Sequence, residues 1–244
     1  MYEELTPELS RRIIELFRKN MAKLQSQELE MKIRRGLATQ ADISKYADKV
    51  GRAGSAAMKQ VLRLEELPDA TMYREIAEQT ITPVMEEMWG DVNNKAALQL
   101  RQIDRKNGMN VGIKTGFKPE RRIKDVVSMV AGQTTQEAVD NALTDPVIAT
   151  ARKYYDDFMR ENADLRNDLG FTQIVIRKYD DRGLHNGKDP CQWCLAREGT
   201  WSLYDAHMNG VFERHPGCNC MIEVISSAKT QVQTDWSTNT WSDL

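Results

Sequence analysis

The stretch Gly170-Phe-Thr-Gln-Ile-Val-Ile-Arg-Lys-Tyr179 marks the point at which the pattern of this chain changes. Its β-branched and aromatic residues predict a strand, whereas the apolar residues before it recur every three to four positions, as in amphipathic helices. A closing strand is predicted at Cys220-Met-Ile-Glu-Val-Ile225. We therefore expect a mainly α protein, with an elongated helical body followed by a small α+β module near the C-terminus.

Residues 1 to about 168 carry the helical pattern. Within the helix expected from Thr71 to Leu100, proline should bend or divide the element, because it lacks an N–H donor and crowds the preceding turn. Four signals are expected to start, end or bend helices: Thr6-Pro7, Gly36 with Thr39-Gln-Ala-Asp42, Pro83, and the capping-box form Thr134-Thr-Gln-Glu137.

These signals divide the chain into regions. The end of the chain is rich in Ser, Thr, Gln and Asp and holds Trp236 and Trp241, so it predicts an extended or disordered tail, which either anchors to a partner and orders there or is simply disordered. We expect four regions: an N-terminal helical region at 1–66, a helical body at 67–169, a zinc-binding β module at 170–226 and the tail at 227–244.

The segment 101–124 differs from the helical body around it. Its glycines and Pro119 predict a loop or an extended arm, and helices should resume near that proline. Such an arm could contact DNA phosphates, which requires only positive charge and reach, or it could be a solvated face balanced by acidic neighbours. Its basic residues are Arg101, Arg105, Lys106, Lys114, Lys118, Arg121, Arg122 and Lys124.

The module after Tyr179 holds all 4 cysteines of the chain. They occur as Cys191-Gln-Trp-Cys194 and, after twenty residues, His215-Pro-Gly-Cys218-Asn-Cys220. Two close pairs of soft ligands separated by a loop are the arrangement that a tetrahedral zinc site needs. There are five candidate ligands for four places. If Cys218 and Cys220 lie in a strand, both point to one face and complete a four-cysteine site; alternatively, His215 displaces one of them.

A closed site with four protein ligands leaves no place for water, so the zinc is expected to be structural. We expect His185 and His207 to be solvated rather than ligands. Trp193 and Trp201 are expected to cover the site and to pack on the adjoining helices.

Composition limits the class of protein. The net charge is -2, charged residues make up 29% and hydrophobic residues 41%, and mean hydropathy is -0.59. No run approaches the length of a membrane span, and the acidic N-terminus lacks an apolar signal core, so we expect neither membrane insertion nor secretion by that route. Cysteines confined to one cluster favour a metal site in a reducing compartment.

Enzyme motifs give little support for catalysis. Pro190-Cys-Gln-Trp-Cys194 matches half of the zinc deaminase signature, but the chain has no His-x-Glu, so that class is excluded. No phosphate-binding loop or dinucleotide fingerprint occurs. A nuclease would have only His185, Asn186 and His215 from which to build a hydrolytic site. We expect no enzymatic activity and no small-molecule substrate.

Two stretches of the module carry a resemblance. Cys191-Gln-Trp-Cys-Leu-Ala-Arg-Glu-Gly-Thr-Trp201 and Phe212-Glu-Arg-His-Pro-Gly-Cys-Asn-Cys-Met-Ile-Glu-Val224 resemble the C-terminal module of tailed-phage minor head proteins, the head-morphogenesis family similar to the F protein of phage Mu, in its Gram-positive phage form. Leu67–Tyr73, Ile76–Pro83 and Phe158–Ala163 look like the helical part of that group. The resemblance covers roughly residues 67–226.

The resemblance implies a structural protein of the virion, built in few copies into the phage head near the portal vertex and present in the host cytoplasm during assembly. Its partners would be the portal protein, the major capsid protein and packaged DNA, and it would act in head morphogenesis with a part in DNA packaging or ejection. The alternative is a zinc-stapled nucleic-acid-binding protein or nuclease that acts in the host cell.

Overall fold

The computed structural model describes residues 2–24, 27–179, 191–215, 217–218 and 220–227. Its α-helices are α1 (Tyr2–Leu24), α2 (Gln27–Arg34), α3 (Gln40–Val61), α4 (Arg74–Lys106), α5 (Glu120–Val130), α6 (Gln136–Ala142), α7 (Asp145–Asp168), α8 (Gln192–Leu195) and α9 (Leu203–Met208). Two 3-10 helices, η1 (Leu64–Glu66) and η2 (Pro68–Ala70), precede α4, and the strands are β1 (Thr172–Lys178), β2 (Gly199–Ser202) and β3 (Met221–Ser227). The expected mainly helical fold with a small C-terminal sheet is confirmed.

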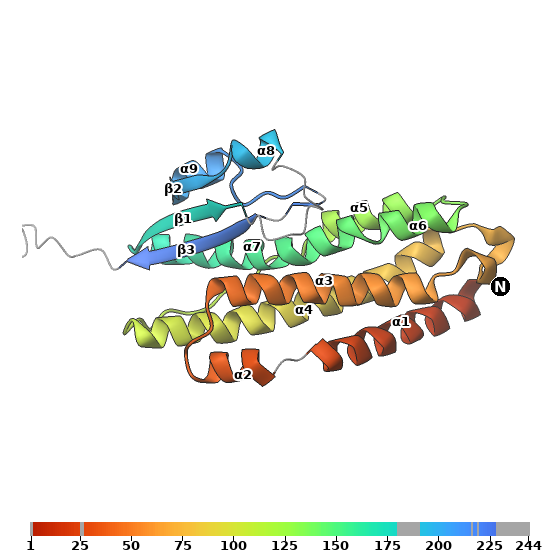
Figure 1. The fold of residues 1–244 in the computed structure, drawn as a ribbon, viewed down its shortest axis with the longest axis horizontal. Coiled ribbons are helices and arrows are strands. Elements are labelled where there is room, and N and C mark those ends of the chain that lie inside the picture. Colours follow the sequence, from red (N-terminus) through yellow and green to blue (C-terminus); the bar gives the residue numbers. More distant parts are fainter. Residues whose placement is uncertain (1, 25–26, 180–190, 216, 219, 228–244) are drawn as a thin grey trace, which may run out of the picture.

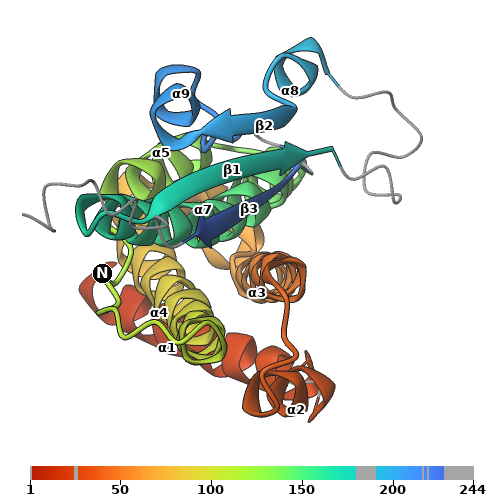
Figure 2. The ribbon, with the colours of Figure 1, turned by 90° about the vertical axis from the view of Figure 1, so that its left-hand side faces the viewer.

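The long helices α1, α3, α4 and α7 run side by side along the long axis of the molecule (Figure 1). The sheet lies over α7, on the side away from α1, and α8 and α9 lie beyond it (Figure 2). The helical body is therefore an elongated bundle, and the module that carries the cysteines is attached to the flank of one helix.

The sheet is antiparallel, with strand order β2-β1-β3. Val175 pairs with Trp201 on one side and with Val224 on the other, and these side chains contribute to the core. The buried apolar side chains form one continuous cluster that extends from Leu9 of α1 to Val224 of β3. The expected regions 1–66, 67–169 and 170–226 all contribute to this cluster, so the bundle and the module share a core.

The backbones of α3 and α7 approach each other closely at Gly51. A Cβ atom on Gly51 would lie 2.8 Å from the Cα atom of Ile148 and 3.0 Å from the Cβ atom of Ala151. Only glycine fits at this crossing, because neither backbone can move without disturbing the packed helices around it. Gly51 therefore sets the distance between α3 and α7, the helix over which the sheet lies.

Some helix signals act as expected. At Thr39-Gln-Ala-Asp42 the threonine caps α3 and Asp42 completes the capping box. The helix after Pro119 begins at Glu120. By contrast, Pro83 does not divide α4, which continues from Arg74 to Lys106. A proline inside a helix costs roughly 3 kcal/mol, but its neighbours Ile81 and Val84 are fully buried, and each such side chain contributes about 1.5–3 kcal/mol.

Two predicted helix starts were wrong. α1 begins at Tyr2 and includes Pro7, and the Thr6 hydroxyl donates a hydrogen bond to the Gln79 side chain on α4. α6 is capped by Thr135, whose hydroxyl accepts from the Ala138 amide, so the expected capping box at Thr134 is not formed.

The 107–119 connection is extended, but it is not a free arm. The Lys114 amide donates to the Asn162 side chain at 3.0 Å, and the Gly116 amide donates to the Asn93 side chain at 2.9 Å. The Trp89 indole donates to the Phe117 carbonyl at 3.2 Å. These hydrogen bonds hold the connection against both α4 and α7.

The predicted tail is only partly within the described residues. Residues 228–244 lie outside the described part of the chain. Ser227, which was expected to begin the tail, instead ends β3.

Candidate metal centre

Local backbone structure presents the cysteines. Cys191 caps α8: its sulfur accepts from the Cys194 amide at 3.4 Å, so both sulfurs of the first pair lie on one turn. The second group lies on a turn in which the Cys218 amide donates to the His215 carbonyl, with Gly217 at φ +75. A left-handed φ of this kind suits glycine, because other residues carry a Cβ that clashes there.

The five predicted ligands converge. The His215 Nε2 atom lies 3.2 Å from the Cys191 sulfur and 3.1 Å from the Cys194 sulfur, and the Cys194 and Cys218 sulfurs are 3.8 Å apart. The donor atoms form two groups that could hold a metal ion, and Cys194 belongs to both: Cys191, Cys194 and His215, and Cys194, Cys218 and Cys220.

These distances fit a metal with soft ligands. Zinc–sulfur bonds of about 2.3 Å at tetrahedral angles place two sulfurs about 3.8 Å apart, and a sulfur and an imidazole nitrogen about 3.6 Å apart. The sulfur pair matches this edge, and the two sulfur–nitrogen distances are somewhat shorter. The donor set therefore suits a divalent thiophilic ion without rearrangement of the backbone.

The prediction that Cys218 and Cys220 converge because both lie in a strand was wrong. β3 begins at Met221, so both cysteines precede the strand and do not owe their common direction to strand alternation. They are nevertheless both buried, at 0% and 2% exposed, as is Cys194 at 1%. Cys191 is exposed. The centre is thus buried at Cys194, Cys218 and Cys220 and reaches the surface at Cys191 and, in part, at His215.

Buried arginines surround the second group. The Arg214 guanidinium pairs with Asp156 of α7, with neither side chain exposed, and its Nη1 lies 3.9 Å from the Cys218 sulfur. Arg152 pairs with Asp48 and donates to the Cys218 carbonyl. Arg177 of β1 donates to the Cys218 sulfur at 3.4 Å. Positive charge is therefore concentrated beside one sulfur.

The thiols respond to this environment in opposite ways. A hydrogen bond from Cys220 and the charges of Arg214 and Arg177 outweigh burial and lower the pKa of Cys218. The same hydrogen bond, together with burial, raises the pKa of Cys220. Burial and the neighbouring Cys218 charge raise the pKa of Cys194. A negative charge is thus best accommodated on Cys218, and a metal ion would have to displace the protons from the other thiols.

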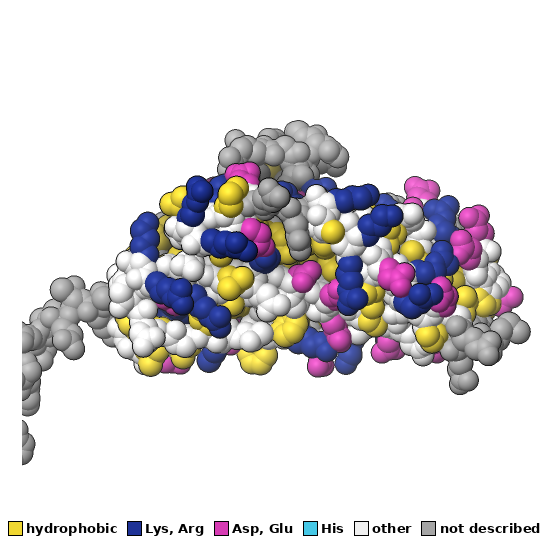
Figure 3. Space-filling model, turned by 90° about the horizontal axis from the view of Figure 1, so that it is seen from below, with side chains coloured by type: hydrophobic (Ala, Val, Ile, Leu, Met, Phe, Trp, Pro, Cys, Tyr) yellow, Lys and Arg dark blue, Asp and Glu magenta, His cyan; other side chains and the backbone are white. Residues whose placement is uncertain are grey.

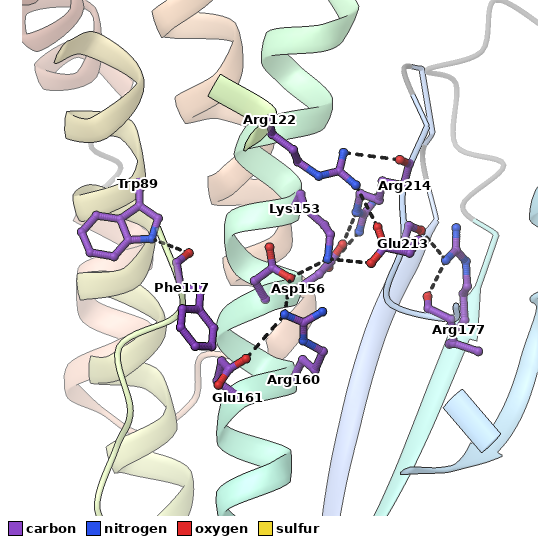
Figure 4. A network of polar contacts seen from close by, with 12 residues as sticks. Trp89, Phe117, Arg122, Lys153, Asp156, Arg160, Glu161, Arg177, Glu213 and Arg214 are labelled. Carbon is purple, nitrogen blue, oxygen red and sulfur yellow. Dashed lines mark hydrogen bonds and ion pairs between the residues drawn. The ribbon is translucent and has the colours of Figure 1, made fainter. Parts of the chain in front are cut away.

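A second set of charges joins the module to α7 (Figure 4). Lys153, 3% exposed, pairs with Asp157 on its own helix and with Glu213 of the module at 3.4 Å. Arg122 of α5 pairs with the same glutamate at 2.9 Å. The segment that precedes His215 is therefore fixed to both α5 and α7, which positions the second donor turn against the first.

Trp193 and Trp201 pack in different places. Trp193 packs beside the cysteine cluster, meets His215 edge-on at 5.3 Å and lies under the Arg197 guanidinium at 3.9 Å. Trp201 instead packs on the main core, and its indole donates to the Arg197 carbonyl. The expectation of a cover over the site thus fits Trp193 alone.

Of the other histidines, His207 lies within the described residues and is not part of the centre. His207 lies on the surface, pairs with Asp164 at 2.7 Å and is not in either donor group. It is partly exposed but hydrogen-bonded rather than simply solvated. His185 lies outside the described residues.

The predicted basic residues lie on three elements. Arg101, Arg105 and Lys106 lie near the end of α4, Lys114 and Lys118 on the 107–119 connection, and the rest on α5. Lys118 pairs with Glu86 at 2.5 Å, and Arg122 pairs with Glu213. Within the described ranges, no ion pair involves the other six residues of the set, which are exposed: Arg101, Arg105, Lys106, Lys114, Arg121 and Lys124.

Figure 3 shows the face formed by α1, α2 and α4. Lys and Arg side chains predominate toward its left-hand end, where α4 finishes, whereas acidic and basic side chains alternate toward the other end. The uneven charge is thus local, although the net charge of the whole chain is only -2.

Sequence reasoning missed the arginines and the carboxylates that support the centre. Arg214 could have been recognised, because it directly precedes the predicted ligand His215. Arg152, Arg177 and Asp156 could not, because only the fold brings them close to the cysteines.

No protein-family model, curated protein or solved structure matches this chain. Among the described helices, none is both long enough and apolar enough to cross a membrane.

Proposed function

We propose that this chain is a structural minor head protein of a tailed bacteriophage, that it is associated with the portal vertex, and that its C-terminal module is held together by one structural zinc ion. The observation that carries the proposal is that the stretch with the minor-head resemblance, 191–224, folds around five converging metal donors.

Zinc is favoured by the donor set. Three or more thiolates with an imidazole are soft and borderline ligands, which suit zinc rather than magnesium or calcium. A four-ligand thiolate site contributes on the order of 10 kcal/mol to the folding of a small domain at neutral pH, and the short strands β1, β2 and β3 benefit from such a link.

A structural role is favoured by how the site is enclosed. Cys194, Cys218 and Cys220 are almost fully buried, so the centre meets water only on the side formed by Cys191 and His215. A catalytic zinc keeps one position open for water or substrate. The buried ion pairs that join the module to α7 also suit a rigid end-piece on a long helical body.

Quantitative mass spectrometry of purified particles from the source phage or prophage tests the proposal. We expect the chain in a small fixed number of copies per portal ring, with one zinc per copy. Absence from particles that contain the portal and major capsid proteins would overturn the virion role and would favour a nucleic-acid-binding protein of the host cell.

Zinc itself is tested separately by elemental analysis of the purified full chain. We expect one equivalent of zinc that a strong chelator removes. A chain that folds its sheet fully with no metal bound would overturn the structural zinc.

A further inference from the structure

Arg177 is the least compensated buried arginine among the described residues. It lies in β1, is 0% exposed, and donates to the carbonyl oxygens of Val211 and Glu213. Its Nη2 donates to the Cys218 sulfur at 3.4 Å, and its guanidinium lies 5.0 Å from the Trp193 ring centre. The Nε atom has no hydrogen-bond partner in the described part of the chain.

The other buried arginines have carboxylate partners. Asp156 serves Arg214, Asp48 serves Arg152 and Asp104 serves Arg166. In the part of the chain that the structure describes, no Asp or Glu pairs with Arg177. An arginine stays charged in proteins, and a buried charge without an opposite charge is strongly disfavoured. The sulfur cluster is the group beside Arg177 that can carry negative charge.

We propose that the centre binds one divalent ion through Cys191, Cys194, His215 and Cys218, that Arg177 is the counter-ion of this centre, and that Cys220 stays outside the ligand set. This inference rests on the proposed metal-binding role of the module and assigns the ligands within it.

Charge balance selects the number of thiolates. A divalent ion with three thiolates and a neutral imidazole carries one negative charge, which the guanidinium of Arg177 neutralises. Two thiolates would leave the buried arginine without an opposite charge. Four thiolates would leave one negative charge that Arg177 does not balance, since Arg214 and Arg152 are already paired with carboxylates.

Geometry joins Cys218 to the first donor group through Cys194. Cys191, Cys194 and His215 form one compact group, and the 3.8 Å separation of the Cys194 and Cys218 sulfurs matches a tetrahedral edge. Cys218 is also the sulfur that receives hydrogen bonds from both Arg177 and Arg214. Cys220 then remains as a thiol beside the centre.

The first experiment compares two arginines that contact the same tryptophan. Arg177→Met removes the charge beside Cys218, whereas Arg197→Met removes a guanidinium that lies over Trp193 and donates to its carbonyl, away from the Cys218 sulfur. Zinc affinity of the full chain is measured by chelator competition. We expect Arg177→Met to weaken zinc binding about 10- to 100-fold, as loss of an outer partner of a metal site does, and Arg197→Met to change it by less than about threefold.

Arg177→Lys keeps the charge and guards against a simple loss of folding. We expect its zinc affinity to lie closer to that of the unchanged protein than to that of Arg177→Met. Equal zinc affinities of Arg177→Met and Arg197→Met, or an equal loss in Arg177→Lys and Arg177→Met, would overturn the counter-ion role.

Cobalt(II) substitution tests the ligand set, because the cobalt–thiolate charge-transfer absorbance grows with the number of bound thiolates. We expect the Cys220→Ser variant to keep the full absorbance, and Cys218→Ser to lose about a third of it or to bind no cobalt. Loss of absorbance in Cys220→Ser with full absorbance in Cys218→Ser would refute the assignment. A chain that binds neither zinc nor cobalt would instead refute the metal-binding role on which the assignment rests.

Discussion

At the scale of single residues, Cys194 occupies the central position of the cluster. Its sulfur belongs to both donor groups, it is 1% exposed, and its amide also closes the turn that presents Cys191. Among the described donors, Cys194 alone belongs to both groups. Its replacement should therefore separate the two turns, whichever cysteine completes the site.

Cys194→Ser should reduce bound zinc to less than about a tenth of an equivalent, because a hydroxyl is a poor substitute for a thiolate in a soft site. Elemental analysis measures the metal, and circular dichroism should show that most helical signal remains, since the long helices pack on one another. Cys191→Ser should lower the metal content in the same direction and loosen residues from about 171 to 226. His207→Ala is the matched control, because His207 pairs with Asp164 away from the cluster. Full zinc in Cys194→Ser would remove this residue from the ligand set.

The buried pair of Asp104 and Arg166 predicts a different kind of result. Their side chains are 5% and 2% exposed and meet at 2.6 Å. Asp104→Leu should lower the free energy of unfolding by about 3–5 kcal/mol, because it leaves a buried arginine with neither its ion-pair partner nor the oxygen that accepts its hydrogen bond, whereas the double variant Asp104→Leu with Arg166→Met should be near neutral or more stable. Urea denaturation measures both, and an additive loss in the double variant would contradict this account.

The same pair predicts a pH dependence. Burial raises the pKa of Asp104 more than Arg166 lowers it. A carboxyl with a raised pKa in the folded state binds its proton more tightly there, so stability falls as pH rises from the ordinary pKa of 3.8 through the folded pKa. The stability difference between the unchanged protein and Asp104→Leu should therefore be largest in acid and should shrink across this window. Urea denaturation over a pH series measures it, and a difference that grows with pH would contradict the raised pKa.

How much of the site could be predicted from sequence depends on how local each signal is. The candidate ligands Cys191, Cys194 and His215 can be recognised in the sequence because metal ligands follow short spacings set by single turns. Arg177 could not be recognised, because its role depends on a strand pairing that brings it beside Cys218. We predicted that the closing strand begins at Cys220, whereas β3 begins one residue later, at Met221. Cys218 and Cys220 therefore do not converge through strand alternation.

At the scale of elements, α7 is the support on which the molecule is assembled. One side packs against α3 and α4, and another carries Arg152, Lys153 and Asp156 to the module. Helix periodicity predicted the existence of α7 but not this charged side, since Arg, Lys and Asp would be assigned to solvent from sequence alone. The continuous α4 and the contact of Thr6 in α1 with Gln79 likewise depend on partners far away in the chain.

The crossing of α3 and α7 can be tested with two glycines. Gly51→Ala should destabilise the protein by about 1–3 kcal/mol, because the added methyl meets the α7 backbone at 2.8 Å. Gly90→Ala, inside α4 with no atom within 4 Å of its added Cβ, should stabilise it by about 0.5–1 kcal/mol. Thermal and urea unfolding compare the two, and a stabilising Gly51→Ala would show that the helices are not in close contact.

At the scale of the whole molecule, charge is distributed along the long axis. The end where α4 finishes carries exposed Arg101, Arg105 and Lys106, and within the described ranges none of the three forms an ion pair. Sequence alone suggested one basic arm over 101–124. The fold instead places its members on separate elements and pairs Lys118 and Arg122 with glutamates, because the 107–119 connection is held against the bundle.

If this end contacts packaged DNA, the variant Arg101→Ala/Arg105→Ala/Lys106→Ala should weaken DNA binding by the full chain. The log-log salt slope should fall by about 0.9 for each phosphate that the variant no longer neutralises. Lys118→Ala, which removes a lysine already paired with Glu86, is the control and should leave the slope unchanged. Fluorescence anisotropy over a salt series measures the slope, and equal slopes for the triple variant and the unchanged protein would exclude this end as the DNA site.

The outer edge of the sheet is closed by one side chain. Gln40 accepts from the Val224 amide at 2.7 Å and donates to the Val224 carbonyl at 2.6 Å, so it takes the place that a neighbouring strand would occupy. An open strand edge can recruit another chain and start aggregation, above all where many copies are crowded together. A single glutamine at the start of α3 therefore occupies the backbone groups in the middle of β3 that a strand of another chain would need for pairing.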